Sequence, residues 1–418
     1  MSYAPLTLDT LGEPVPKAFR RGTHRAVAPE ETLARVGRLM PALGITRIAN
    51  ITGLDTVGLP VVVVTRPNAR SLAVSQGKGL DLAAAKASGL MEAVEGYHAE
   101  HITLPLKLAS YEELRYSHPL ADVERLPRDH SGLFDPERPI LWVEGLDIVG
   151  GGRCWVPFEL VHTNYTLAMH GHSAGFLASS NGLASGNHLL EAICHGIYEV
   201  VERDAHALWL LRGEEEQAAT RVRLDSVDDS ACRSVLARFA AAEVLVGVWE
   251  ITSDVGIPAF LCRVVDASES ALRRLCYAEG MGCHPAREVA LLRALTEAAQ
   301  SRVTLIAGVR DDCFPEIYQQ LRDPDLLDRQ RREIAFGLQE RPFAAAPTWE
   351  ADTLNADLAW ALERLAAAGF EQVIVVDLSR PELRVPVARV IIPGMEHISD
   401  KTSYTLGRRA RALLGRGL

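Results

Sequence analysis

The chain has 418 residues, of which 48% are hydrophobic and 23% charged, and its formal net charge is −10. That length supports a sizeable core with two or three lobes, while the acidic balance argues against nucleic acid as the main partner, because phosphate backbones bind cationic surfaces. No uncharged stretch reaches the ~18 residues that a membrane span needs, and no apolar run follows a basic start as in a signal peptide.

The first half of the chain predicts an arm followed by strands and helices. Residues 1–20 contain prolines and lack periodicity, which is typical of an extended arm. Four consecutive valines suit a sheet interior, so 57–66 is predicted to be a buried strand. The other expected elements are a helix over 32–43 with 29–31 as its acidic first turn, a glycine turn at 76–79, a helix over 82–100, a surface excursion at 106–140, a strand at 141–146 and a glycine-rich hairpin at 147–158.

The second half centres on 179–206, where a Ser-Asn-Gly turn and Gly186 lead into about five turns of helix. The other expected elements are an acidic stretch at 213–230, strands at 243–249 and 257–265, a glycine turn at 279–283, a helix over 285–306, a partly helical region at 307–355, a helix over 354–368 and strands at 372–377 and 385–392.

On the helix after Gly186, polar and apolar residues separate onto two faces. At ~100° per residue, one arc holds Asn187, Glu191, His195, Glu199 and Glu202, and aliphatic side chains fill the opposite arc. Such a face belongs either to an ordinary solvated helix or to the wall of a cation site. Glu191 and Glu202 lie ~16 Å apart along an ideal helix, so they cannot share one ion. The row fits an extended polyphosphate with two or more cations better.

A similar arrangement recurs at intervals of about one hundred residues. A glycine-rich turn precedes each of three helices, and each helix bears an acid pair or a close substitute. These pairs are Glu92 and Glu95, Glu199 and Glu202, and Glu297 and Gln300. We therefore expect duplicated strand–turn–helix units around a shared centre, against the alternative of chance resemblance between alanine-rich helices.

The first of these helices carries carboxylates in an apolar setting. Glu92 and Glu95 share a face, with Ser88 one turn before Glu92, and their sequence neighbours are apolar. Two carboxylates are costly to bury without a cation. Oxygen ligands without a dedicated cysteine or histidine set favour Mg²⁺ shared with substrate phosphates.

Phosphates also need cationic donors. Lys78 is expected in a glycine turn at a helix start, and Arg203 and Arg302 each lie within one turn of an acidic or amide pair. The segment around Lys78 is not a Walker A loop, because Gly79 stands where that motif has Ser or Thr and Leu72 where it has its first glycine.

Other kinds of site find less support. Glu95-x-x-His98 is half of a carboxylate di-iron signature without a second copy, and Cys283-His284 has no marked base for a nucleophile. Seven cysteines without a Cys-x-x-Cys pair fit a reduced chain, so we expect a cytoplasmic protein. No catalytic side chain is assigned. The histidines that would suggest zinc lack a ligand spacing; they are His162, His170, His172, His188 and His195.

Taken together, these motifs resemble those of the YcaO family over about residues 21–397. By spacing, Arg25 and Thr32 also match a basic residue and a hydroxyl that contact nucleotide in such proteins. The resemblance rests on Ser75-Gln-Gly-Lys-Gly79, Ser88-x-x-x-Glu92-x-x-Glu95, Asn187-x-x-x-Glu191, Glu199-x-x-Glu202-Arg203, Glu297-x-x-Gln300-x-Arg302 and Pro393-Gly394-Met395-Glu396.

This resemblance implies an α+β, YcaO-type fold that binds ATP and Mg²⁺. It divides the chain into an N-terminal arm and helix that contribute to the nucleotide site (1–60), a YcaO domain (61–400) and a basic tail (401–418). The implied magnesium ligands are Glu92, Glu95, Glu191, Glu199 and Glu202, and the implied nucleotide contacts are Arg25, Thr32, Lys78, Ser88, Asn187, Arg203, Gln300 and Arg302.

YcaO proteins phosphorylate the carbonyl oxygen of a peptide backbone amide around attack by a nucleophile, and the product is an azoline, a thioamide or an amidine. Many azoline-forming members end in a proline-rich tail, whereas this chain ends Leu414-Gly-Arg-Gly-Leu418, and the portion before Arg21 is short for a leader-binding domain. Together with 17–25 and 54–60, these features resemble members that pair with a TfuA protein in thioamide formation. We expect such a partner, a peptide substrate and a homodimer. The alternatives are an azoline-forming cyclodehydratase and a non-catalytic ATP-binding accessory protein.

Overall fold

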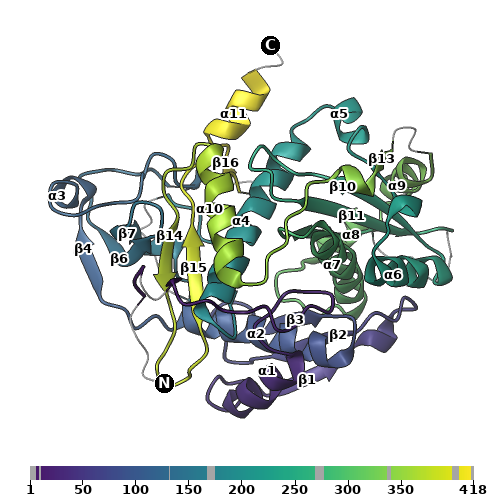
Figure 1. Cartoon of the computed structure of the whole chain (residues 1–418), viewed down its shortest axis with the longest axis horizontal. Coiled ribbons are helices and arrows are strands. Elements are labelled where there is room, and N and C mark those ends of the chain that lie inside the picture. Colours follow the sequence, from purple (N-terminus) through teal and green to yellow (C-terminus); the bar gives the residue numbers. More distant parts are fainter. Residues whose placement is uncertain are drawn as a thin grey trace.

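The computed structural model describes residues 6–8, 11–130, 132–166, 175–268, 277–336, 340–397 and 404–415, and it mixes helices with mainly antiparallel sheets, in agreement with the α+β prediction. The long helix α4 (Leu189–Leu210) runs through the middle of the molecule, with sheets on either side of it (Figure 1). Of the helices in the described part of the chain, none is long and apolar enough to cross a membrane.

The first repeated unit is a three-stranded antiparallel sheet covered by one helix. Strands β1 (Arg47–Asn50), β2 (Val61–Thr65) and β3 (Val74–Lys78) lie in that order, and α2 (Leu82–Glu100) packs on β2 and β3. The Asp81 carboxylate accepts a hydrogen bond from the Ala84 backbone N–H and caps α2. Residue 60 lies in the connection between β1 and β2, immediately before β2 begins.

The other two units repeat this design. Strands β10 (Val244–Glu250), β11 (Ala259–Asp266) and β12 (Ala278–Cys283) form a sheet under α7 (Arg287–Ala307). Helix α4 packs on β15 (Val387–Ile391) and β8 (Leu183–Ser185), which end a six-stranded sheet of order β4-β6-β14-β15-β8, with β7 on β6. The remaining strands of that sheet are β4 (Leu106–Ala109), β6 (Ile140–Asp147), β7 (Gly152–Pro157) and β14 (Ile374–Asp377).

The three units close into a ring. Besides its own strands, α2 contacts β8, α4 contacts β12 and α7 contacts β3. Each helix therefore touches a strand of the next unit, and the faces bearing the acid pairs are directed towards a common centre. The predicted repeat is present, and its physical basis is that three helices share one packing surface.

Two of the predicted glycine turns are wrong, because 76–79 lies mostly in β3 and 279–283 lies in β12. A Cβ on Gly77 would meet the Ala85 carbonyl oxygen at 2.0 Å, and a Cβ on Gly282 would meet the Ala290 carbonyl oxygen at 2.0 Å. The glycines are there because each helix lies directly against its strand, which tolerates no side chain between them. Lys78 is consequently the last residue of a strand, and not part of a turn.

The remaining elements surround this ring. The predicted helix 32–43 begins earlier and ends sooner, as α1 (Pro29–Val36) followed by a 3₁₀ turn (Gly37–Leu39), and the predicted excursion 106–140 contains a strand of the large sheet. The other elements are α3 (Tyr111–Leu114), β5 (Arg128–Asp129), α5 (Glu214–Ala218), β9 (Val222–Arg223), α6 (Ser230–Ala241), α8 (Pro315–Leu321), α9 (Pro324–Phe336), β13 (Arg341–Pro342), α10 (Leu354–Ala367), β16 (Tyr404–Thr405) and α11 (Arg408–Gly415).

Candidate functional site

The first acid pair is held by backbone groups of two different units. Glu92 Oε2 accepts a hydrogen bond from the Gln76 N–H of its own strand at 3.3 Å. Glu95 Oε1 reaches across to β8 and accepts from the Ser185 N–H at 2.8 Å and from the Ser185 hydroxyl at 2.7 Å. The ring of helices and strands thus determines where both carboxylates lie.

The third pair differs from the first because a lysine neutralises it. Lys78 Nζ lies 2.6 Å from Glu297 Oε2, and the Met281 N–H donates to Glu297 Oε1 at 3.2 Å. Burial opposes ionisation of Glu297, but the Lys78 ammonium and nearby arginines hold its pKa below the usual value. Gln300 Nε2 donates to Gln76 Oε1 at 3.4 Å. The third unit therefore supplies no uncompensated negative charge.

The other two pairs are under-compensated. Glu92 is exposed and Glu95 half-buried, but loss of solvation beside the surrounding protein raises the pKa of Glu95 to about 8 and that of Glu92 to about 7, although Lys78 lowers the latter in part. Burial and the neighbouring Glu297 raise the pKa of Glu202 to about 7, and burial also raises the pKa of Glu199. Glu202 Oε2 is buried and has no hydrogen-bond partner among the residues that the structure describes. These carboxylates act on one another electrostatically, which favours the binding of a cation beside them.

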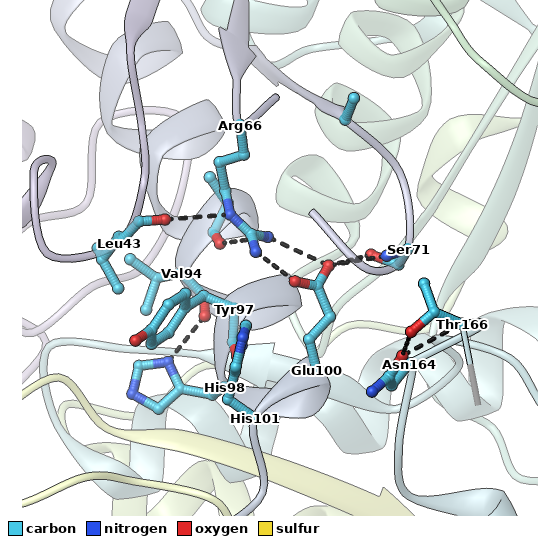
Figure 2. Close-up of polar contacts among 12 residues, drawn as sticks. Leu43, Arg66, Ser71, Val94, Tyr97, His98, Glu100, His101, Asn164 and Thr166 are labelled. Atoms are coloured by element: carbon cyan, nitrogen blue, oxygen red, sulfur yellow. Dashed lines mark hydrogen bonds and ion pairs between the residues drawn. The ribbon is translucent and has the colours of Figure 1, made fainter. Parts of the chain in front are cut away.

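A fully satisfied carboxylate on the same helix provides the contrast. Glu100 is 3% exposed and forms an ion pair with Arg66, and the backbone N–H and the hydroxyl of Ser71 donate to it (Figure 2). This pair fastens the C-terminal end of α2 to the β2–β3 connection. In the described part of the chain no arginine forms an ion pair with Glu92 or Glu95, although Lys78 and Arg310 lower the pKa of Glu92 without forming an ion pair with it.

The carboxylate set fits Mg²⁺ in its donor chemistry, since oxygen ligands on a few carboxylates are typical of magnesium shared with phosphates. In the described ranges, no three His, Cys, Asp or Glu side chains lie close enough to hold one ion by themselves. Phosphate oxygens of a nucleotide would have to complete the coordination.

The N-terminal arm contributes to the other end of α4, as expected. Glu191 is 3% exposed and accepts from the Ala26 N–H at 2.8 Å, and Arg25 Nη1 lies 3.7 Å from its other oxygen. The Thr32 hydroxyl donates to Asn187 Oδ1 at 3.0 Å. The structure therefore brings together Arg25, Thr32, Asn187 and Glu191 from segments more than 150 residues apart.

Arg293 belongs to the site although the sequence reasoning passed over it. It lines a cavity together with Arg25, Glu191 and His195, and its Nε is buried without a hydrogen-bond partner. Its charge also lowers the pKa of Glu202 and Glu199, as that of Arg203 does. The signal was present, because Arg293-x-x-x-Glu297-x-x-Gln300 has the spacing of Ser88-x-x-x-Glu92-x-x-Glu95.

Arg302 was predicted to contact phosphate, but the structure does not place its side chain beside the carboxylates of this site. Its guanidinium is 1% exposed and paired with Asp55 at 2.9 Å and Asp266 at 2.7 Å. Five residues along a helix correspond to a rotation of about 140°, so Arg302 lies on a different face from Glu297. The short distance in sequence between Arg302 and the third pair did not predict that they lie together in space. The role of this arginine is structural.

Replacing Arg302 with methionine is expected to lower the free energy of unfolding by about 3–5 kcal/mol, because two acidic groups lose their buried partner. Chemical denaturation measures this loss. The control is Arg223→Met, which removes an exposed pair with Asp225 and should change stability by less than about 1 kcal/mol. Equal effects of the two substitutions would contradict the structural role.

The competing sites gain no support. His98 Nδ1 lies 2.8 Å from the Val94 carbonyl oxygen, so it is occupied within its own helix. Burial lowers the pKa of His195 well below the usual value and raises that of Cys283 well above it, which disfavours a charged histidine and a thiolate alike. Ser88 is half-buried on α2, one turn before Glu92. His170 and His172 lie outside the described residues.

Comparisons with known proteins relate the chain to one family. The family model described as YcaO cyclodehydratase, ATP- and Mg²⁺-binding, matches residues 76–396. The chain is 39% identical to an uncharacterized protein in the tfuA 3′ region of Rhizobium leguminosarum bv. trifolii, with 92% of each chain covered. It is 27% identical to the ribosomal protein S12 methylthiotransferase accessory factor YcaO of Escherichia coli over 66% of this chain and 48% of that one.

Solved structures show the same fold. The YcaO protein of Methanopyrus kandleri bound with AMPPCP and Mg²⁺ superposes with a TM-score of 0.70 at 23% identity, covering 91% of this chain and 95% of the other. A heterocyclase in complex with substrate and cofactor gives a TM-score of 0.78 at 25% identity and 96% coverage of this chain, which spans 56% of that protein's length. With the family model matching most of its length, the chain belongs to the YcaO family, which binds ATP and Mg²⁺.

Proposed function

We propose that this protein activates a backbone amide of a peptide or protein by transferring the γ-phosphoryl group of ATP to the amide oxygen. The observation that carries this proposal is the set of under-compensated carboxylates Glu92, Glu95, Glu199 and Glu202. Such a set suits magnesium bound to a triphosphate, and phosphoryl transfer relies mainly on positioning and charge stabilisation.

Within this proposal, two groups of residues contact different parts of the nucleotide. Arg25, Thr32, Asn187 and Glu191 would contact one end of it, where the arm meets α4. Lys78, Arg203 and Arg293 would face the phosphates, and Ser88 and Gln300 lie beside the carboxylates on their helices. When bound, Mg²⁺ would neutralise the developing phosphate charge. Arg302 has no part in this assignment.

The nucleophile would come from outside the chain. Burial raises the pKa of Cys154, Cys194, Cys232, Cys262 and Cys283, so none of these five is a ready thiolate. We propose sulfide as the nucleophile. The overall reaction joins the amide, HS⁻ and ATP and yields the thioamide, ADP and phosphate. The amide oxygen leaves with the phosphate, and sulfur takes its place on carbon.

We also propose a TfuA-like protein as the partner, a homodimer as the assembly and the cytoplasm as the location. The relative from Rhizobium leguminosarum is named for its position in the tfuA 3′ region, which supports the partner. The peptide substrate is proposed from membership of the YcaO family. Co-purification with a TfuA-like protein and light scattering of the purified chain test the partner and the dimer.

The mass of the product decides between the two peptide chemistries. Incubating a candidate peptide with the protein, its partner, ATP, Mg²⁺ and sulfide should add ~16 Da per modified amide, because sulfur replaces oxygen after activation. Omitting sulfide is the control. A loss of ~18 Da would instead identify azoline formation from a Cys, Ser or Thr side chain. The family description as a cyclodehydratase and the 25%-identical heterocyclase favour that second candidate.

A non-catalytic accessory role is the third candidate, and the Escherichia coli relative is named as an accessory factor. ATP binding without any peptide-dependent phosphate release, at peptide and partner concentrations that saturate binding, would support it and exclude the proposed reaction.

A further inference from the structure

The segment that leads to Arg25 is fastened to helix α10 before it reaches the candidate site. The Lys17 N–H donates to the carbonyl oxygen of Asp352, just before α10 begins, at 3.0 Å. Helix α10 packs alongside α4, which bears Glu191 (Figure 1). Residues 17–26 therefore form a strap from the start of one helix to the neighbouring helix.

At one end of this strap, Lys17 has a complete set of buried partners. Its ammonium donates to the two carboxylate oxygens of Asp357 on α10 at 3.0 and 2.9 Å, and it lies 3.4 Å from His24 Nδ1. The side chains of Lys17 and Asp357 are 1% and 2% exposed. An ammonium has three donors and no acceptor, so His24 Nδ1 is the acceptor and the ring proton is on Nε2. Burial, followed by the charge of Lys17, lowers the pKa of His24 to about 4, which keeps the ring neutral.

His24 connects this anchor to the other end of the strap. Phe19 and Arg25 exchange two backbone hydrogen bonds, of 3.0 and 2.9 Å, so the chain between them doubles back on itself. Immediately afterwards the Ala26 N–H donates to Glu191 Oε2 at 2.8 Å, and Arg25 Nη1 lies 3.7 Å from the other oxygen of that carboxylate. Because His24 directly precedes Arg25, fixing its ring restricts where the following two residues can lie.

We propose that Lys17 is a positioning residue for the nucleotide. Held by Asp357, its ammonium fixes the ring of His24, and the neighbouring Arg25 then stays beside Glu191. The inference rests on the proposed function, in which these last two residues contact one end of the nucleotide. Lys17 itself does not touch the nucleotide, because all three of its donors are used. A strap that is already held in one arrangement loses less conformational entropy on binding than a mobile one.

The chemistry of the pair favours positioning over stability alone. Well-packed apolar residues of similar volume stabilise a fold as well as a buried ion pair does, or better. What the pair of Lys17 and Asp357 adds is a directed hydrogen bond to His24 Nδ1, which apolar side chains cannot make. The strap also carries an exposed pair, Arg20 with Asp352 at 2.8 Å. Because exposed pairs contribute little, this pair provides the control for removing a cation from the same segment.

The experiment measures binding of AMPPCP with Mg²⁺ by calorimetry in Lys17→Met, in the double variant Lys17→Met with Asp357→Leu, and in Arg20→Met. We expect both Lys17 variants to bind about 10–100-fold more weakly, because the strap is then correctly placed in only ~1–10% of the molecules. Lys17→Met alone should also lower the melting temperature, because Asp357 is left buried and unpaired, and the second substitution should restore it. Arg20→Met should leave the affinity within about twofold of the wild type.

Two further readouts separate positioning from folding. Without nucleotide, amide hydrogen exchange over residues 17–26 should be faster in the double variant than in the wild type, and saturating AMPPCP with Mg²⁺ should restore the protection. In peptide-dependent phosphate release, the KM for ATP should rise by the same factor as the dissociation constant of AMPPCP. The rate at saturating ATP should stay within about threefold of the wild type, because bound nucleotide selects the correctly placed strap.

An affinity that recovers together with the melting temperature in the double variant would overturn the inference, since the pair would then only stabilise the fold. An unchanged affinity in Lys17→Met, or an equal loss of affinity in Arg20→Met, would overturn it as well. A wild-type protein that binds AMPPCP but never releases phosphate in response to peptide refutes the proposed function, while the binding measurements still decide the role of Lys17. An active wild type whose affinity does not depend on Lys17 refutes only this inference.

Discussion

Replacing Glu202 with glutamine is expected to reduce peptide-dependent phosphate release by on the order of a thousandfold while the fold stays intact. Glu202 is 3% exposed and one of its oxygens has no partner. An amide of the same shape cannot offer a charged oxygen to a cation, and the loss of several kcal/mol of charge stabilisation corresponds to a factor of this size.

The matched control is Glu363→Gln, the same change at an exposed position of α10, which should leave the rate within twofold. Phosphate release and thermal melting are measured on both variants. The protein without nucleotide should melt at an equal or higher temperature after Glu202→Gln, because the glutamine has no charge to bury. A rate that survives the substitution, or a rate lost only because the protein unfolds, would remove Glu202 from the magnesium site.

The residues that the sequence located well are those whose chemistry repeats at helical spacing. Glu92, Glu95, Glu199 and Glu202 share faces of helices whose extents were close to those observed, since α2 spans Leu82–Glu100 as predicted. Acid pairs flanked by apolar residues are conspicuous because burying them is costly. The repeat also made the convergence of three helices predictable before any contact was known.

The predictions that were wrong concern residues whose surroundings are determined by packing between distant parts of the chain. Gly77 and Gly282 look like turn residues in sequence, but they lie in strands because a helix from the same unit crosses directly over them. Arg302 is near the third pair in sequence, yet its partners Asp55 and Asp266 come from two other parts of the chain. No local pattern identifies such partners.

Without Mg²⁺ and nucleotide, the ionisation of Glu95 and Glu202 is expected to lower the stability of the protein as the pH rises from 6.5 to 8. The pKa values of Glu95 and Glu202, about 8 and about 7 in the folded protein, lie above the ordinary value of 4.5. In this window the unfolded chain has already released these protons, so the folded state binds more protons and its stability falls with pH. At about 1.4 kcal/mol per pH unit for each bound proton, Glu95 alone contributes a decrease of about 2 kcal/mol.

Buried histidines act in the opposite direction at the lower end of this window. Burial lowers the pKa values of His24 and His98 to about 4, so both are neutral in the folded protein, whereas in the unfolded chain, with the ordinary value of 6.5, they are half protonated at pH 6.5. The wild type is therefore compared with Glu95→Gln, which has the same histidines. Between pH 6.5 and 8 the wild type should lose about 2 kcal/mol of stability relative to this variant, because an amide does not titrate. Mg²⁺ with AMPPCP should raise the melting temperature of the wild type most at pH 8, since the cation binds the ionised carboxylates and displaces their protons. A stability difference between the two proteins that does not change with pH would mean that Glu95 is already compensated, and the magnesium site would have to lie elsewhere.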